Sequence, residues 1–506
     1  MFRPVPPQTT RVREVPIRRT TNLDLYRVVD HLDAAVAELR EMGRRVSDSL
    51  GRNRVWMVSS TVTGGGVAES MPRACSLLTD LGVDTRWLVL EPGDPSFFTL
   101  TKSLHNMLHG VPGTQDLEAA RSVYERVSAE AAAEMRQVDA RDILVIHDPQ
   151  PAGIALHLRR PEPGRLAWRC HVGIPERNEH TNAAWSFLRP YLGVYDRLLF
   201  TLMAYVPDEW LDRSGELCPG IDPFSHKNRP LRPYKLLGIL RSAGLIPGPS
   251  VPRWARFRAK VQRWIGKWDE SPLPSLLYCP TILQVSRFDR LKGFESLLPA
   301  FELLTRTAPE LAASLPANAD RVKSEIERAH LVLAGPDPSG VADDPEAEEV
   351  LDDLCRRHDR LPSHLKERVH VMRLPMVDVK ENALIVNALQ RVAAVVVQNS
   401  IREGFGLTVS EALWKRAPVA ASNVGGLARQ IRHGSDGVLI DDPRSPESIA
   451  AALLELIASP MQGEAMARSG RERVSTHFTV LSEIKSWLLA FSRLLEGADP
   501  APSPDG

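Results

Sequence analysis

The feature that most constrains the fold is the alternation of short apolar runs with segments of helical periodicity. Five apolar runs occupy residues 54–59, 85–90, 143–148, 166–171 and 196–201. After about 80 residues, six more follow at 281–286, 330–335, 368–373, 392–398, 417–422 and 437–442. Such alternation is typical of βαβ units and a parallel sheet. Two series therefore predict an α/β protein with two Rossmann-like, doubly wound domains.

The same pattern predicts where ligands bind. Ligands of doubly wound sheets lie beyond the carboxyl ends of the strands. Two such domains facing each other would place the active site in a cleft between them. We therefore examined the polar residues that directly follow each apolar run.

The expected domain organisation has five parts. An N-terminal extension carries one helix, over residues 23–49, after a Pro-, Arg- and Thr-rich start that we expect to be poorly ordered. A linker contains a basic and aromatic stretch, and a last helix is followed by a polar tail. The boundaries are 1–50 for the extension, 51–220 for the first domain, 221–280 for the linker, 281–475 for the second domain and 476–506 for the last helix and tail.

Composition excludes several classes of protein. Lys and Arg number 63 and Asp and Glu number 63, so the net charge is zero, whereas a protein that binds nucleic acid through its phosphates is usually basic. The five cysteines are scattered and form no metal-binding pair, which indicates free thiols in a reducing compartment. No apolar run is long enough to span a membrane. We expect a cytoplasmic protein and leave its oligomeric state open, a homodimer included.

The most informative local pattern is REGFGLTVSEALWKRAPV, residues 402–419. A glycine-bearing loop leads from a strand into a helix near Leu407, and amides at a helix start attract anions. Glu403 and Glu411 add two carboxylates that can accept from hydroxyl groups. Together they suggest a sugar-nucleotide site. The plain alternative is a structural helix with two solvated glutamates.

A second pattern, SRFDRLKG at 286–293, places Arg287 and Lys292 directly after a strand. Both cations can converge on one diphosphate, the arginine through two hydrogen bonds and the lysine as a point charge. Standing alone, the pair is as consistent with two solvated surface cations.

Three weaker signals lie in the first half. Three glycines, Gly64 to Gly66, follow a strand without the Lys-Ser/Thr of a P-loop, so a tight turn is the plain alternative. His147 and Asp148 in HDPQP, and His171 in RCH, end two further apolar runs. A histidine at a strand end is as often a hydrogen-bonded surface group as a functional one.

Taken together, these motifs resemble the retaining GT-B glycosyltransferases that include sucrose and glycogen synthases. The family's pair of glutamates, separated by seven residues, is matched by Glu403 and Glu411. VWMVSSTVTGGGVAE, HDPQPA, WRCH, QVSRFD, SIREGFGLTVSEALWK and VGG are similar to the branch of glycosyl-transferring trehalose synthases. Retaining trehalose phosphorylases share many of these sequence motifs. The resemblance covers roughly residues 54–495.

The resemblance implies a role for each matched residue. Arg287 and Lys292 would hold the donor diphosphate, Glu403 the transferred glucose and Glu411 the ribose. Asp148 and His171 would contact the sugars at the reaction centre. The remaining implied positions are Gly404, Phe405, Gly406 and Leu407 at the glucose and phosphate, Gly65 and Gly66 over the phosphates, and His147 and Gln150 on the acceptor side. It implies no metal and no cofactor, and it implies that the C-terminal helix near Ser482 to Leu495 crosses back to the first domain.

The function implied is transfer of glucose from a nucleoside-diphosphate glucose to glucose, which forms trehalose reversibly with retention of configuration. We find no carboxylate suited to a double displacement, and the family's alternative is front-face attack with the diphosphate accepting the proton. The alternatives are a trehalose phosphorylase, another acceptor sugar and, least expected, a non-catalytic GT-B binding protein.

One segment departs from the family. Residues 250–268 are basic, contain no acid, and place Trp254, Val261, Trp264 and Trp268 near one face of a helix. Such a helix would dock a partner or a membrane surface, or else pack its aromatic side chains on the protein itself.

Overall fold

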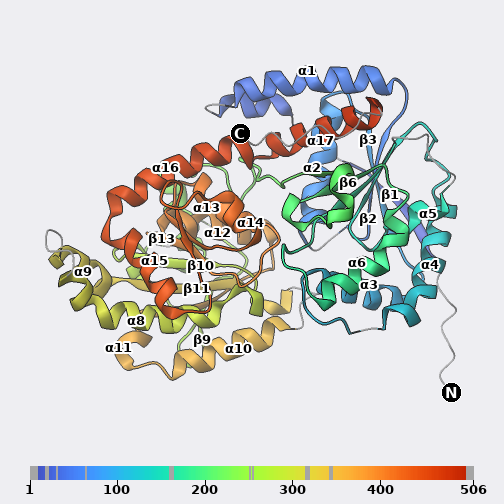
Figure 1. The fold of residues 1–506 in the computed structure, drawn as a ribbon. Coiled ribbons are helices and arrows are strands. Elements are labelled where there is room, and N and C mark those ends of the chain that lie inside the picture. Colours follow the sequence, from blue (N-terminus) through green and yellow to red (C-terminus); the bar gives the residue numbers. More distant parts are fainter. Residues whose placement is uncertain are drawn as a thin grey trace. The chain divides into compact units, whose positions relative to one another are not determined.

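Every apolar run of the sequence forms a strand in one of two separate sheets of the computed structural model (Figure 1). The described residues are 9–17, 22–29, 32–62, 65–114, 116–158, 165–249, 252, 256–313, 319–340 and 346–496. The chain divides into two units, one of residues 1–220 and 480–506 and the other of residues 221–479. Each unit has its own sheet and core and is described by itself.

The first unit contains a seven-stranded sheet with the order β1-β3-β2-β4-β5-β6-β7. All neighbouring strands run parallel except β1, which pairs antiparallel with β3. Strands β2 and β4 are buried along their whole length because helices cover both faces. The strands are β1 (Arg11–Val15), β2 (Val55–Ser59), β3 (Thr85–Glu91), β4 (Ile143–His147), β5 (Leu166–Cys170), β6 (Arg197–Phe200) and β7 (Ser214–Glu216).

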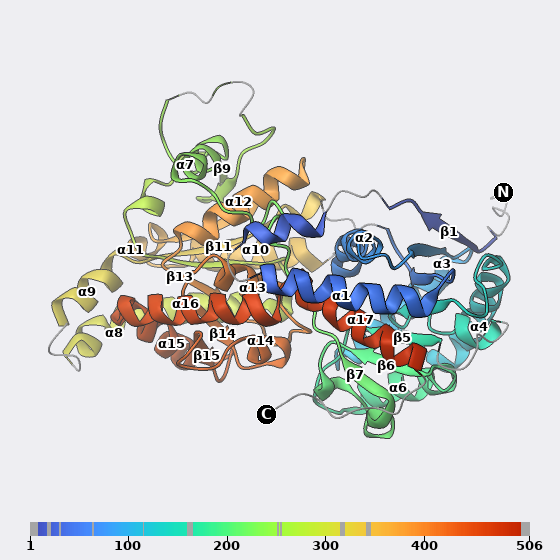
Figure 2. The same cartoon turned by 90° about the horizontal axis from the view of Figure 1, so that it is seen from above.

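The helices of the first unit are η1 (Leu23–Val28), α1 (Asp33–Leu50), α2 (Gly65–Asp80), α3 (Pro95–Leu108), α4 (Leu117–Glu134), α5 (Ile154–His157), α6 (Glu179–Leu192), η2 (Met203–Tyr205), η3 (Asp208–Arg213) and α17 (Val480–Glu496). The final helix thus belongs to the unit that contains the start of the chain. It packs against α1 (Figures 1 and 2), where Lys485 Nζ lies 2.7 Å from Glu38 Oε1.

The N-terminal segment differs from the expectation in two ways. Residues 11–15 form an ordered edge strand, although we expected the start of the chain to be poorly ordered. The single helix expected over residues 23–49 is two helices, η1 and α1, because Val29 adopts an extended conformation between them. A β-branched residue accepts that conformation readily.

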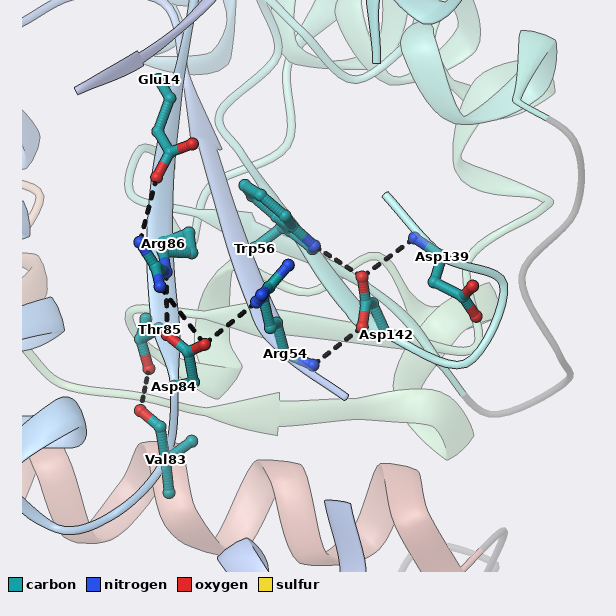
Figure 3. A network of polar contacts seen from close by, with 9 residues as sticks. All are labelled: Glu14, Arg54, Trp56, Val83, Asp84, Thr85, Arg86, Asp139 and Asp142. Atoms are coloured by element: carbon teal, nitrogen blue, oxygen red, sulfur yellow. Dashed lines mark hydrogen bonds and ion pairs between the residues drawn. The ribbon is translucent and has the colours of Figure 1, made fainter. Parts of the chain in front are cut away.

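A polar network ties together the amino ends of three strands of the first sheet (Figure 3). The Asp142 carboxylate accepts from Arg54 N at 2.8 Å, Trp56 Nε1 at 2.7 Å and Asp139 N at 2.9 Å. Asp84 similarly accepts from the guanidinium groups of Arg54 and Arg86. This network fixes the strand ends opposite those that carry the candidate site residues.

The second unit contains an eight-stranded sheet with the order β15-β14-β13-β10-β11-β12-β8-β9. Strands β10 to β15 are parallel, and β8 and β9 form an antiparallel hairpin on the edge of β12. The strands are β8 (Gln262–Trp264), β9 (Trp268–Asp269), β10 (Thr281–Val285), β11 (His330–Pro336), β12 (Val369–Leu374), β13 (Val395–Gln398), β14 (Val419–Ser422) and β15 (Val438–Ile440).

The helices of the second unit are α7 (Pro233–Ser242), η5 (Pro274–Leu277), η6 (Arg290–Lys292), α8 (Phe294–Ala313), α9 (Ala319–Arg328), η7 (Pro338–Gly340), α10 (Glu346–Asp359), α11 (Ser363–Lys366), α12 (Val379–Val392), α13 (Leu407–Trp414), α14 (Gly425–Gln430), α15 (Pro446–Ala458) and α16 (Pro460–His477). Residues 221–280, expected as a linker, belong to this unit. No described helix has the length and apolar character needed to cross a membrane.

The helix expected within residues 250–268 is wrong for the part that the structure describes, which forms the β8–β9 hairpin. Trp254 lies outside the described residues. Trp264 and Trp268 pack against the core of the second unit, where Trp264 Nε1 donates to Asp359 at 2.8 Å and the Arg373 guanidinium lies 4.4 Å from the centre of the Trp268 ring. Because Trp264 and Trp268 are directly opposite each other across the hairpin, both rings lie on the same face of it and pack on the protein.

Candidate functional site

In the second unit, the candidate donor residues follow strands β10 and β13, which are neighbours in the sheet. After β10, Asp289 caps the short helix η6 by accepting from Leu291 N, and η6 ends at Lys292. After β13, residues 399–406 form a loop that leads into α13. Because both loops leave the carboxyl edge of the same sheet, their side chains can meet there.

The two loops are joined by an ion pair. Lys292 Nζ lies 2.6 Å from Glu403 Oε2, and the two side chains are 16% and 13% exposed. Ser400 Oγ donates to the same carboxylate oxygen at 3.0 Å. The pair is too little exposed to be an ordinary solvated surface contact, so the structure brings together two of the residues that the sequence singled out.

Buried amides fix the loops beneath this pair. Gln284 Nε2 donates to Lys292 O at 2.8 Å while its Oε1 accepts from Asn399 N at 2.9 Å. Asn399 Nδ2 in turn donates to Gly293 O and Pro443 O. Gln284 thus bonds the backbone of both loops, and Asn399 ties its own loop to Gly293 and to the segment after β15, which holds the Lys292–Glu403 pair in one geometry.

The backbone of the Gly404–Leu407 loop is fixed by the side chain of Gln430. Gly406 precedes α13 with a left-handed φ of 77°, a conformation that glycine adopts without strain. Gln430 is fully buried and donates to Phe405 O at 2.6 Å, and its Oε1 accepts from Ser410 N at 2.9 Å. Gln430 therefore fixes the turn from which α13 begins, and the start of a helix is where backbone amides attract anions.

Glu411 lies one turn further into α13, with 7% of its surface exposed. Its Oε1 is 3.8 Å from Lys227 Nζ. Four residues along, the buried Lys415 donates to Glu411 O at 2.9 Å. Burial lowers the pKa of Lys415 to about 7, although the charge of Glu411 acts in the opposite direction. Arg287, by contrast, is exposed in the loop after β10.

In the first unit, two histidines and an aspartate meet at the carboxyl ends of β4 and β5. His147 Nδ1 and His171 Nε2 are 2.9 Å apart and the rings stack with centres 5.2 Å apart. Burial lowers the pKa of His147 to about 3 and that of His171 well below its ordinary value. Both rings are therefore neutral near pH 7, and one ring donates to the other.

Asp148 follows His147 with a left-handed φ of 66°, which turns its carboxylate toward the next strand. Its Oδ1 accepts from His171 N at 2.9 Å. Burial raises the pKa of Asp148 to about 6, against the opposing effects of the His171 N–H and the Arg169 charge. A φ of this sign in a residue other than glycine marks a position where the backbone is constrained.

Behind this group lies a buried charge pattern that the sequence did not predict. Arg169 is completely buried and donates to Cys170 O and Leu217 O, both at 2.7 Å. The charges of Glu483 on α17 and of Asp148 favour its protonated form, although burial lowers its pKa. Arg169 was visible in WRCH, but nothing in the sequence paired it with Glu483, more than 300 residues away.

The other expected residues of the first unit are less constrained. Gln150 follows Asp148 closely in the chain, and its Oε1 is buried without a hydrogen-bond partner, which leaves an acceptor for a ligand. Gly65 and Gly66 are the first residues of α2, while Gly64 lies outside the described residues.

Two family models match the chain. Residues 57–207 match "Trehalose synthase, N-terminal domain", and residues 279–473 match "Glycosyl transferases group 1". A trehalose synthase of Pyrococcus horikoshii is 31% identical over 85% of this chain and 88% of its own length. One of Rubrobacter xylanophilus is 32% identical over 90% of this chain and 94% of its own. A trehalose phosphorylase of Pleurotus sajor-caju is 28% identical over 86% of this chain but only 57% of its own length.

Solved structures agree on the fold. A UDP-forming α,α-trehalose-phosphate synthase of Burkholderia xenovorans, solved with glucose-6-phosphate, matches with a TM-score of 0.61 at 15% identity, over 88% of this chain and 100% of that structure. This likeness shows the GT-B fold, and the match to the glycosyl transferase family model makes the protein a GT-B glycosyltransferase. Within that class, the chain belongs to the trehalose synthase family and is a hexosyltransferase.

Proposed function

We propose that the protein transfers glucose from a nucleoside-diphosphate glucose to free glucose, forming α,α-trehalose with retention of configuration. The observation that carries the proposal is the Lys292–Glu403 pair, which joins a cation for the diphosphate to a carboxylate for the sugar at 2.6 Å. Membership of the trehalose synthase family supports the choice of acceptor.

On the donor side, Arg287 and Lys292 neutralise the diphosphate as it departs, and the amides of Gly404 to Leu407 add donors that need no reorganisation. Glu403 keeps one oxygen on Lys292 and Ser400 and offers the other to glucose hydroxyls. Glu411 accepts from the ribose hydroxyls. Such an arrangement stabilises the negative charge that develops on the diphosphate as it leaves the glucose.

On the acceptor side, Asp148 and His171 bind the reacting sugars, and the acceptor atom of Gln150 takes a sugar hydroxyl. The bond from the glucose anomeric carbon to the diphosphate oxygen breaks, and a bond from the same face to the acceptor hydroxyl oxygen forms. The hydroxyl proton passes to the departing diphosphate. Because attack and departure share one face, the configuration is retained without a covalent enzyme intermediate.

A product assay tests this proposal. The protein is incubated with UDP-, ADP- or GDP-glucose and with glucose, and proton NMR identifies the disaccharide and its anomeric configuration. Formation of α,α-trehalose and free nucleoside diphosphate supports the proposal. An inverted linkage, or transfer to other sugars but not to glucose, contradicts it.

Trehalose phosphorolysis is the second candidate, because a fungal trehalose phosphorylase matches most of this chain. Inorganic phosphate would then occupy the place of the diphosphate. Incubation with trehalose and either phosphate or a nucleoside diphosphate separates the two reactions. A phosphorylase releases glucose 1-phosphate with the first, whereas the proposed transferase forms a nucleotide sugar with the second.

A further inference from the structure

The second unit contains a segment beside Glu411 that lies outside both matched family models. Residues Ser225–Arg229 fall between the models, which end at 207 and begin at 279. Lys227 in this segment places its Nζ 3.8 Å from Glu411 Oε1, with side-chain exposures of 39% and 9%. Three groups of contacts in the second unit determine the position of this segment.

Side chains of α12 fix the path of the segment. Asn387 Nδ2 donates to His226 O and to Arg229 O, both at 3.0 Å, and Asn387 is completely buried. Arg391 Nη2 donates to Arg229 O at 3.2 Å, and its Nε donates to Asn387 Oδ1 at 2.8 Å. Buried polar groups that are satisfied by one backbone path disfavour every other path.

A buried lysine then joins this segment to the helix that carries Glu411. Lys415 Nζ donates to Asn228 Oδ1 at 3.0 Å, to Gln390 Oε1 at 2.7 Å and to Glu411 O at 2.9 Å. Asn228 is the neighbour of Lys227 in the chain, so one ammonium group joins the segment that carries Lys227 to the helix that carries Glu411. The buried core thus fixes the two backbone positions from which the side chains of Lys227 and Glu411 approach each other.

The charges around the pair favour an anionic ligand. Lys227 Nζ lies 3.8 Å from the Glu411 carboxylate, and Lys415, whose pKa burial lowers to about 7, adds a second nitrogen that donates to Glu411 O. A surface ion pair by itself contributes little to the stability of a protein. Stabilisation of the fold is therefore a poor explanation for why buried groups hold the segments of Lys227 and Glu411 side by side. A nucleotide can bind to both residues, because its ribose hydroxyls can donate to the Glu411 carboxylate and its phosphates can accept from the Lys227 ammonium group.

We propose that Lys227 is a further donor-binding residue, which orients Glu411 toward the ribose hydroxyls and contributes positive charge to the nucleotide beside the ribose. The proposal rests on the proposed function, since it takes Glu411 as the ribose-binding group. It extends the donor site to a segment that neither family model includes.

Calorimetric titration with nucleoside diphosphates tests this proposal without turnover. UDP, ADP and GDP are titrated into the wild type, and the tightest of them into Lys227→Met, Lys227→Gln and Lys227→Arg. Because both variants lose a charge-assisted hydrogen bond to the nucleotide, we expect Kd to rise at least about 10-fold in them. Lys227→Arg should stay within about 3-fold of the wild type. Lys235→Met, on exposed α7 of the same unit, is the matched control and should not change Kd.

The 2′-deoxy form of the same nucleotide tests the orienting role. Removing the hydroxyl should weaken binding to the wild type by about 10-fold and to Lys227→Met by about 3-fold or less, because Glu411 is no longer aligned. An unchanged Kd in both Lys227→Met and Lys227→Gln, or an undiminished penalty for the deoxy form, overturns the inference while the proposed function stands. If the wild type binds none of the three diphosphates, the proposed function falls, and this inference with it.

Discussion

Lys292 and Arg287 are the residues from which we expect the largest effects on turnover. Replacing either by alanine should lower kcat at least about 100-fold, the scale of losing one donor to a transition-state charge. Steady-state kinetics measures the effect, with circular dichroism to confirm folding. Arg290→Ala is the matched control, because Arg290 lies on the same short helix but pairs at the surface with Glu349. Turnover near that of the wild type in Arg287→Ala or Lys292→Ala would refute the diphosphate assignment.

The two glutamates should have separable effects. Glu403→Gln should slow transfer more than it weakens binding of a free nucleoside diphosphate, because Glu403 is assigned to the glucose. Glu411→Ala should weaken nucleotide binding by roughly 1.5–3 kcal/mol, the contribution of a hydrogen bond to a charged group. Titration with the nucleotide alone, beside kinetics, distinguishes the two. Equal losses of nucleotide affinity would contradict this division of roles.

Asp148 should give the pH profile its acidic limb. Its pKa is raised to about 6, so the carboxylate is largely protonated below pH 6 and ionised above it. If the ionised form binds the sugar, log kcat/KM should fall with unit slope below about pH 6. Asp148→Asn tolerates the same left-handed backbone and should be less active but lack this limb. Kinetics from pH 5 to 8 measures both, and a limb that persists in Asp148→Asn would assign it to another group.

The same pKa shift predicts an effect on stability. A carboxyl group whose pKa is raised in the folded state lowers the free energy of unfolding when it is ionised. This destabilisation is complete above the folded-state pKa of about 6, and it disappears well below the ordinary pKa of 3.8. At pH 8, Asp148→Asn should therefore have a free energy of unfolding about 1–3 kcal/mol higher than the wild type, measured by urea denaturation. At pH 4 the difference should shrink toward zero. A difference that is independent of pH would exclude ionisation of Asp148 as its cause.

At the scale of elements, the junction between η6 and α8 depends on Gly293. Its φ is 62°, and an added Cβ would lie 2.1 Å from Asn399 O, in the loop that carries Glu403. Gly293→Ala should therefore separate the two donor loops, raise KM for the nucleotide sugar and destabilise the protein by several kcal/mol. Gly434→Ala is the control, because Gly434 has a φ of 74° but open space around it, and its cost should be only about 1 kcal/mol. Equal urea midpoints for the two variants would show that the close approach is unimportant.

The sequence predicted elements well where apolar pattern alone decides them. Runs such as ILVIH and TILQV are short, rich in β-branched residues and buried on both faces, which favours central strands of a parallel sheet. The hairpin β8–β9 was misassigned because Trp264 and Trp268 fit a helical spacing as well as positions flanking a tight turn. The Lys292–Glu403 pair follows from neighbouring strands, and so was predictable in outline. Lys227, Gln430 and Glu483 were not, because their partners are distant in sequence and only the folded chain brings them near.

At the scale of the whole molecule, the two units have separate cores and should respond separately to ligand. The residues assigned to the nucleotide, Arg287, Lys292 and Glu411, all belong to the second unit. A nucleoside diphosphate at 100 times its Kd should stabilise that unit by about 2.7 kcal/mol. Hydrogen exchange read by mass spectrometry should show slower exchange in peptides of residues 281–479. Protection confined to peptides of the first unit would contradict the assignment.

A last prediction concerns α17, which lies near the C-terminal end of the chain but belongs to the first unit. Trp487 on α17 is 2% exposed and its ring centre lies 5.7 Å from that of His147, in the same unit. Trp487→Ala should destabilise the first unit by about 3–5 kcal/mol, the usual cost of removing a buried aromatic side chain, and should lower trehalose formation through the displaced His147–His171 pair. Leu489→Ala, on the same helix but 43% exposed, is the control and should be nearly neutral. In Trp487→Ala, peptides of residues 55–216 should exchange faster, while peptides of residues 281–479 and the Kd for a nucleoside diphosphate should remain as in the wild type. Faster exchange throughout both units would instead indicate that the chain unfolds as one cooperative body, and α17 would then stabilise the whole protein and not the first unit alone.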